Sequence, residues 1–223
     1  NLSLAFKIPK SKTGKNQKFS TYILTNGSVL GELRLSSEFD WVNKEYDFFS
    51  GNIVGHQVSD KNGSLFNVLS IYSPAWCVPW DRLNGIDVSK VKLHNNPDVW
   101  CTEIIWSLLC NSLPSLDQNW IMAGDFNCST TFDWMWGKKP RGNQEIIDRL
   151  TNLGLTDCLS FHHGNLVPTF KNTTGGKVIH QLDYVYVNEP LLSRLKYCDT
   201  SYSDVVFDQN ISDHLPIIAE FSD

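Results

Sequence analysis

The chain lacks both a long apolar run and an excess of basic residues. No stretch approaches the roughly 18 apolar residues of a membrane span, and no signal peptide opens the chain. Its 19 lysines and arginines are outnumbered by 24 acidic residues, so the formal net charge is −5. This balance argues against a strongly basic, non-specific nucleic-acid binder, whose affinity comes from many phosphate contacts. It does not exclude a nuclease, because bound cations and a local basic patch can offset a mildly acidic surface.

The six cysteines show neither CxxC pairs nor the spacing of a zinc site. We therefore expect reduced thiols in an intracellular, cytoplasmic protein rather than disulfides. No feature of the sequence indicates an obligate protein partner. The first residue is Asn rather than Met, so we expect a segment of a longer protein.

Length and composition predict one globular domain. The 223 residues suffice for a sizeable core. A content of 41% hydrophobic and 19% charged residues is ordinary for a globular protein in water. Apolar, β-branched runs with turn residues between them predict strands at residues 19–24, 53–58, 65–72, 120–123, 182–187, 197–203 and 215–221.

Two helices are predicted between these strands. The first has Asn96 as its cap and Pro97 in its first turn, and Pro114 stops it. The second runs from about residue 144 to 153, with Gly154 as its end signal. Strands alternating with helices predict a layered α/β fold.

Polar clusters lie at the ends of three of the apolar runs. They are Gly124-Asp125-Phe126-Asn127, Gln181-Leu182-Asp183-Tyr184 and Ser212-Asp213-His214-Leu215. Carboxylates, an amide and an imidazole at strand ends are what metal-assisted hydrolysis needs, to hold a cation, orient a phosphate and ready a water.

Together with the pair Thr169-Phe170, these clusters resemble, in order, the motifs of the endonuclease/exonuclease/phosphatase family. The resemblance runs from about Lys15 to the C-terminus. It implies a four-layer α/β sandwich of two packed mixed β-sheets flanked by helices. It also implies Mg²⁺- or Mn²⁺-dependent attack on a phosphoester, and it leaves the substrate open.

The resemblance assigns roles to the residues of the motifs. Asp125 would contact the metal or the nucleophilic water, and Asn127 would hydrogen-bond the scissile phosphate, although Gly-Asp-x-Asn is also a common turn. Asp183 would hydrogen-bond His214 and raise its basicity. His214 would either take a proton from water or stabilise the phosphate. Asp213 would align His214 or bind metal, and its alternative role is a cap before the last strand.

Two supporting residues complete the expected site. Tyr72 would hydrogen-bond the phosphate, its alternative being a core tyrosine, and Thr169 would support Asp183 or Asn127 from behind. Phe170 is expected in the core rather than stacked on a base. Ala75 replaces the Asn that endonuclease members often carry after Tyr-x-Pro, so close analogy with their substrates does not follow.

The loop at residues 130–141 interleaves aromatic and basic side chains. Aromatic rings that stack on bases beside cations that meet phosphates predict a nucleic-acid contact. A loop pinned by its tryptophans, with solvated lysines outside, is the alternative. The candidate substrate-binding residues are Trp134, Trp136, Lys138, Lys139 and Arg141.

The family's first two strands, which end in an Asn and in the metal-ligand Glu, are not found. That Glu should lie roughly 70 residues before Tyr72, at or before residue 1, so we expect residues 1–223 to be a catalytic domain without these strands. Glu32, Glu38 and Glu45 lie too close to Tyr72 and lack the apolar lead-in, so none is assigned as the ligand.

The leading hypothesis is a Mg²⁺-dependent phosphodiesterase with DNA as its substrate, an endonuclease in the broad sense. The acidic balance and Ala75 support an alternative, a phosphatase or phospholipase acting on a small or lipid phosphoester. A non-catalytic binding module with a decayed metal site is a third hypothesis. The retained Asp125, Asn127, Asp183 and His214 argue against it, since a dead site has no chemical need for the set.

Overall fold

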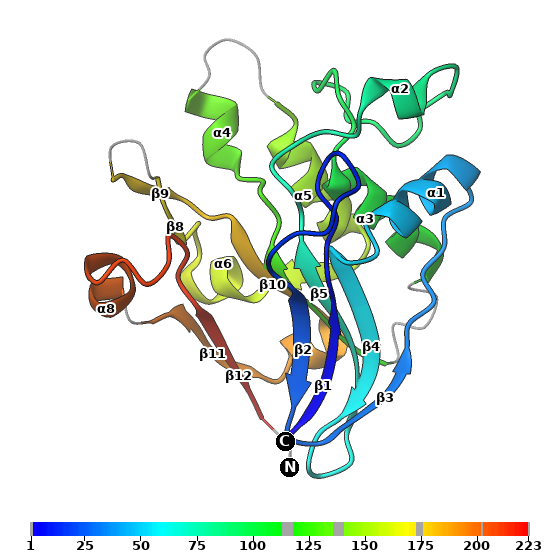
Figure 1. Cartoon of the computed structure of the whole chain (residues 1–223). Coiled ribbons are helices and arrows are strands. Elements are labelled where there is room, and N and C mark those ends of the chain that lie inside the picture. The colour runs from blue at the N-terminus through cyan, green and yellow to red at the C-terminus, as the bar shows by residue number, and fades with distance from the viewer. Residues whose placement is uncertain (1, 113–117, 136–140, 173–175, 202, 223) are drawn as a thin grey trace.

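The centre of the molecule is a six-stranded mixed sheet (Figure 1). The computed structural model describes residues 2–112, 118–135, 141–172, 176–201 and 203–222. Within the sheet only β5 and β6 run parallel, and every other neighbouring pair is antiparallel. In spatial order its strands are β3 (Ser28–Glu32), β4 (Ile53–Ser59), β5 (Leu65–Tyr72), β6 (Asn119–Asp125), β10 (Asp183–Asn188) and β7 (Leu155–Asp157).

Two antiparallel strand pairs form a second layer on one face of this sheet. The pair β1 (Ser3–Lys7) and β2 (Thr21–Thr25) packs over β4 and β5 through Ala5, Ile23 and Val54. The pair β11 (Leu195–Thr200) and β12 (Ile217–Phe221) packs over β10 through Cys198 and Val187. A short hairpin of β8 (Phe170–Lys171) and β9 (Val178–His180) lies beside them.

Helices cover the other face of the central sheet. The main core lies between β4, β5, β6 and β10 and the helices α1 (Asp40–Phe48), α3 (Cys101–Ser112) and α5 (Asn143–Asn152). Helix α6 (Cys158–His163) is an exception, because it packs against β10 and β11 on the side of the second layer. The remaining short helices are α2 (Trp80–Leu83), α4 (Thr130–Met135), α7 (Glu189–Leu192) and α8 (Ser203–Asp208). No helix among the described residues combines the length and the apolar character needed to span a bilayer.

The predicted layered α/β fold is confirmed, with a second sheet layer built from two separate pairs. The predictions for β4, β5, β6 and α5 match to within about two residues, and Gly154 takes the left-handed conformation, φ 81°, that follows a helix. Predicted strand 197–203 is wrong at its end, because α8 begins at Ser203.

The predicted start of the first helix is also wrong. Asn96 does not cap α3, which begins five residues later at Cys101. The Asn96 side chain instead accepts a hydrogen bond from the Asp98 amide at 3.0 Å and donates one to the Arg141 carbonyl at 3.0 Å. A local Asx turn therefore competes successfully with helix capping at this residue.

Candidate active site

The sheet register places three of the predicted residues side by side. Tyr72 at the end of β5 is paired with Asp125 at the end of β6, and Asp125 is paired with Asp183 at the start of β10. Polar motifs more than 50 residues apart in sequence thus meet at one edge of the central sheet.

Gly124 permits the close approach of β5 and β6 at this edge. Its φ is +137°, and a Cβ atom built on it would lie 1.9 Å from the carbonyl oxygen of Ile71. Only glycine fits there, because both the backbone angle and the neighbouring carbonyl exclude a side chain. The glycine of the Gly-Asp-x-Asn motif therefore sets the position of Asp125.

Asn127 turns back towards Asp125. Its φ of 48° is left-handed, and its backbone N–H donates to Asp125 Oδ1 at 2.8 Å. Its side-chain amide donates to Asp125 Oδ2 at 2.8 Å and to the Ser73 carbonyl at 2.7 Å. Both amide hydrogens are thereby used, so in this structure Asn127 orients Asp125.

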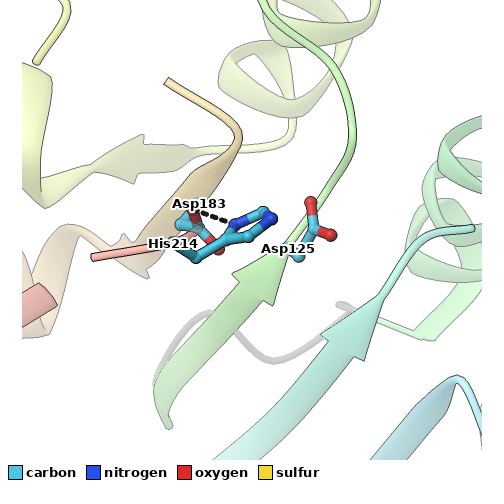
Figure 2. Close-up of side chains that lie close together, drawn as sticks. All are labelled: Asp125, Asp183 and His214. Carbon is cyan, nitrogen blue, oxygen red and sulfur yellow. Dashed lines mark hydrogen bonds and ion pairs between the residues drawn. The ribbon is translucent and has the colours of Figure 1, made fainter. Parts of the chain in front are cut away.

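Asp183 holds His214 and is itself held by Thr169. Figure 2 shows the Asp183 carboxylate bonded to one ring nitrogen of His214, with the second nitrogen on the side facing Asp125; the bonded distance, Oδ2 to Nδ1, is 2.8 Å. The buried Thr169 hydroxyl donates to the same Oδ2 at 2.7 Å and accepts the backbone N–H groups of Leu182 and Asp183. Thr169 therefore supports Asp183, one of its two expected partners.

Burial and the neighbouring negative charge disfavour the ionised form of Asp125. Desolvation, followed by the nearby charge of Asp183, raises the pKa of Asp125 to about 7, while His214 and the Asn127 amide act in the opposite direction. Desolvation, with a smaller effect of Asp125, also raises the pKa of the half-buried Tyr72. A cation bound here would favour the ionised form of Asp125 and so lower its pKa.

His214 is basic for a partly buried histidine. Burial alone would lower its pKa, but the hydrogen bond and charge of Asp183, with the charges of Asp125 and Asp213, outweigh burial and raise it. Bonding of Nδ1 to Asp183 leaves Nε2 for a substrate or water.

The candidate metal ligands among the described residues form one group of three. One ligand atom each of Asp125, Asp183 and His214 lies within 4.8 Å of the other two. Asp213 is exposed and outside this group, although its charge acts on Asp125 and His214. Its role as a ligand stays a prediction.

The three glutamates set aside on sequence grounds lie elsewhere. Glu32 pairs with Lys7, Glu45 pairs with Arg82 at 2.8 Å, and Glu38 is exposed. None belongs to the group of ligand atoms found among the described residues.

The predicted substrate-binding loop is only partly described. Trp136, Lys138 and Lys139 lie outside the described residues, and Trp134 is described only as backbone within α4. Arg141 is exposed, and its backbone N–H donates to Asp133 Oδ1 at 2.6 Å. The nucleic-acid role of this loop stays a prediction.

Phe170 contacts His214 rather than lying deep in the core. The two ring centroids are 4.9 Å apart, and the two residues form an isolated β-bridge. Sequence reasoning missed this contact, since only tertiary structure brings the two segments together.

Sequence reasoning also missed Glu103, on α3. It is fully buried beside the site, and no periodic or motif signal marks it as other than a helix residue.

Comparison with known proteins gives a family match and a shared fold. A model of the Endonuclease/Exonuclease/phosphatase family matches residues 33–214. No match was found among the curated proteins.

Among solved structures, an AP endonuclease from Archaeoglobus fulgidus is 14% identical, with a TM-score of 0.65 over 99% of this chain and 80% of that one. The 3′ phosphatase NExo from Neisseria, bound to a product DNA hairpin, is 15% identical, with a TM-score of 0.59 over 98% and 79%. A family protein from Leptotrichia buccalis is 16% identical, with a TM-score of 0.61 over 100% and 72%. At such identities the structural likeness shows the fold alone.

Proposed function

This chain belongs to the endonuclease/exonuclease/phosphatase family, and we propose that it is a divalent-metal-dependent phosphodiesterase that cleaves DNA. The observation that carries the proposal is the cluster of Asp125, Asp183 and His214, with His214 held at 2.8 Å by Asp183. Such a pair fixes the histidine tautomer and leaves its other nitrogen for chemistry.

The side chains fit a divalent cation. Carboxylate oxygens are the ligands that Mg²⁺ and Mn²⁺ prefer, and a bound cation would oppose the burial and the Asp183 charge that raise the pKa of Asp125. Asp125 and Asp213 would hold the cation, while Asp183 stays with His214. When bound, the cation would stabilise charge on the scissile phosphate and lower the pKa of a water.

The chain's own residues would position the reaction. Asn127 fixes the direction of the Asp125 carboxylate through two hydrogen bonds. His214 Nε2 would either accept a proton from the attacking water or, when protonated, donate a hydrogen bond to the phosphate. Tyr72, which is paired with Asp125 across the sheet, would donate a hydrogen bond from its hydroxyl to the phosphate.

The choice of DNA as the substrate is supported by two proteins of similar fold. One such protein is called an AP endonuclease, and another was solved with a product DNA hairpin. The second is also called a 3′ phosphatase, and Ala75 departs from the endonuclease pattern. A phosphatase acting on a small or lipid phosphoester is therefore the alternative.

The test compares cleavage of a labelled DNA duplex by the wild type, His214→Ala and Asp125→Ala, with Mg²⁺, Mn²⁺ or EDTA. Exposed residues supply the matched controls His162→Ala and Asp148→Ala. We expect cleavage by the wild type and both controls only with metal, and no turnover by the two site variants at unchanged melting temperature. Wild-type rates in EDTA, or in either site variant, would refute the assignment. Faster release of phosphate from a soluble phosphomonoester than cleavage of DNA would favour the phosphatase.

A further inference from the structure

A cavity of about 220 Å³ adjoins the active site. It begins at Asn127, whose side-chain amide donates a hydrogen bond to Asp125. It extends towards α3, where Glu103 and the residue just before the helix, Trp100, form part of its wall. Phe132 adds aromatic surface, the buried Phe126 lies in the wall, and the exposed Ala75 borders the cavity. One ordered water needs only about 10–15 Å³, so the cavity has room for a ring-sized group.

Glu103 is a buried carboxyl with spare hydrogen-bonding capacity in this cavity. Its side chain is 0% exposed. Thr102 donates to its Oε2 at 2.9 Å, whereas Oε1 has no hydrogen-bond partner among the residues that the structure describes. An unpaired buried oxygen is costly, so a ligand that donates a hydrogen bond to it would recover that cost.

The electrostatics of Glu103 agree with this geometry. Burial raises its pKa to about 7, although the Thr102 hydroxyl, the backbone N–H groups of Trp100 and Glu103 and the charge of Arg149 lower it in part. Near neutral pH the group is thus able to accept an N–H as a carboxylate or to donate an O–H as an acid. The two protonation states together suit a ligand whose edge carries hydrogen-bond donors and acceptors side by side.

We propose that this cavity is a nucleobase subsite, in which a base next to the scissile phosphate lies between Trp100 and Phe132 with its polar edge on Glu103. The inference rests on the proposed function and deepens it by naming the group that the enzyme reads. A nucleotide carries its base one sugar away from its phosphate, and the cavity begins one side chain away from Asp125. Enzymes that receive a base in a pocket combine aromatic stacking with hydrogen bonds to the base edge in this way.

Glu103 also lies in the first turn of α3, where an acidic side chain favours the helix. That role alone would change stability equally for every substrate. A base-reading role changes the relative rates of substrates that differ only in the base, and this difference is the measurable signature.

The experiment uses two sets of oligonucleotides with one cleavable phosphodiester. One set carries each of the four bases beside that bond, and the other carries a base-free tetrahydrofuran residue. Specificity, kcat/KM, is measured for the wild type, Glu103→Gln and Ala75→Phe, with the exposed Glu38→Gln as the matched control. Glu103→Gln keeps the size but replaces one acceptor by a donor, and Ala75→Phe narrows the entrance from an exposed loop.

We expect Glu103→Gln to change the ratio of base-bearing to base-free cleavage by roughly two- to tenfold, the worth of one neutral hydrogen bond, and to reorder the four bases. Ala75→Phe should lower the same ratio even if Glu103→Gln fails to fold. Fluorescence of 2-aminopurine beside the bond should be quenched by the wild type and less by Ala75→Phe. Ratios and quenching equal in all variants would overturn the subsite. A wild type that cleaves neither set would instead overturn the proposed function.

Discussion

Replacing Thr169 by valine removes one buried hydroxyl while keeping the volume of the side chain. This hydroxyl makes three hydrogen bonds at the centre of the site. It donates to Asp183 Oδ2 at 2.7 Å, and it accepts the backbone N–H groups of Leu182 at 3.0 Å and of Asp183 at 3.1 Å. Thr169 is 0% exposed, so water cannot replace the lost partner in the native state.

The expected cost follows from the two backbone donors. Each buried N–H left without a partner costs about 1–3 kcal/mol, so Thr169→Val should lower the free energy of unfolding by about 2–6 kcal/mol. That is a large part of the 5–15 kcal/mol typical of a domain. Because Asp183 also loses a donor that fixes its carboxylate, His214 is held less firmly, and activity should fall about 10- to 100-fold.

Thr169→Ser is the matched control. It keeps the hydroxyl and loses a methyl group, which costs roughly 1 kcal/mol. Urea unfolding at fixed pH gives the stability of both variants, and cleavage of one labelled substrate gives kcat/KM. The interpretation fails if Thr169→Val is as stable and active as the wild type, or if Thr169→Ser loses as much activity as Thr169→Val.

Three further outcomes are expected. Gly124→Ala should cost at least about 3 kcal/mol in urea unfolding, since it combines a positive φ with a steric clash, whereas Gly63→Ala, also at positive φ but with open space, should cost only about 1 kcal/mol. Because the pKa of Glu103 is raised from 4.5 to about 7 in the fold, its contribution to stability is present below pH 4.5 and is lost as the pH rises to about 7. The loss is on the order of 3 kcal/mol, and Glu103→Gln should remove this part of the pH dependence in urea titrations. Asp183→Asn should lower kcat less than His214→Ala does, because an Asn oxygen still accepts from the ring; an equal loss would mean that the charge of the carboxylate, rather than its hydrogen bond, is what matters.

The positions of Tyr72, Asp125 and Asp183 could be predicted because each lies at one end of a strand of the central sheet. Local patterns indicate where strands end. In the folded sheet, the pairing of β6 with β10 then places Asp125 directly beside Asp183. The pairing of Asp183 with His214 came from the resemblance, since 31 residues separate them. No local pattern specifies such a distance.

The cavity at Glu103 shows what local patterns leave out. In sequence, Glu103 is one acidic residue within a predicted helix, and nothing in the pattern sets it apart. The cavity that it lines takes other parts of its wall from α5 and from the loop after β5, both distant in the chain. Nothing in the sequence around a single acidic residue shows whether its side chain is exposed to solvent or buried.

Asn127 shows where a local strand rule stops applying. Residues two apart on a strand share a face, so this spacing alone predicts that Asp125 and Asn127 reach one ligand together. The strand ends at Asp125, however, and Asn127 adopts φ 48°. Its amide therefore folds back on Asp125 and on the Ser73 carbonyl. To bind a phosphate as the family resemblance implies, Asn127 would first have to give up one of these bonds, which couples phosphate binding to the orientation of the Asp125 carboxylate.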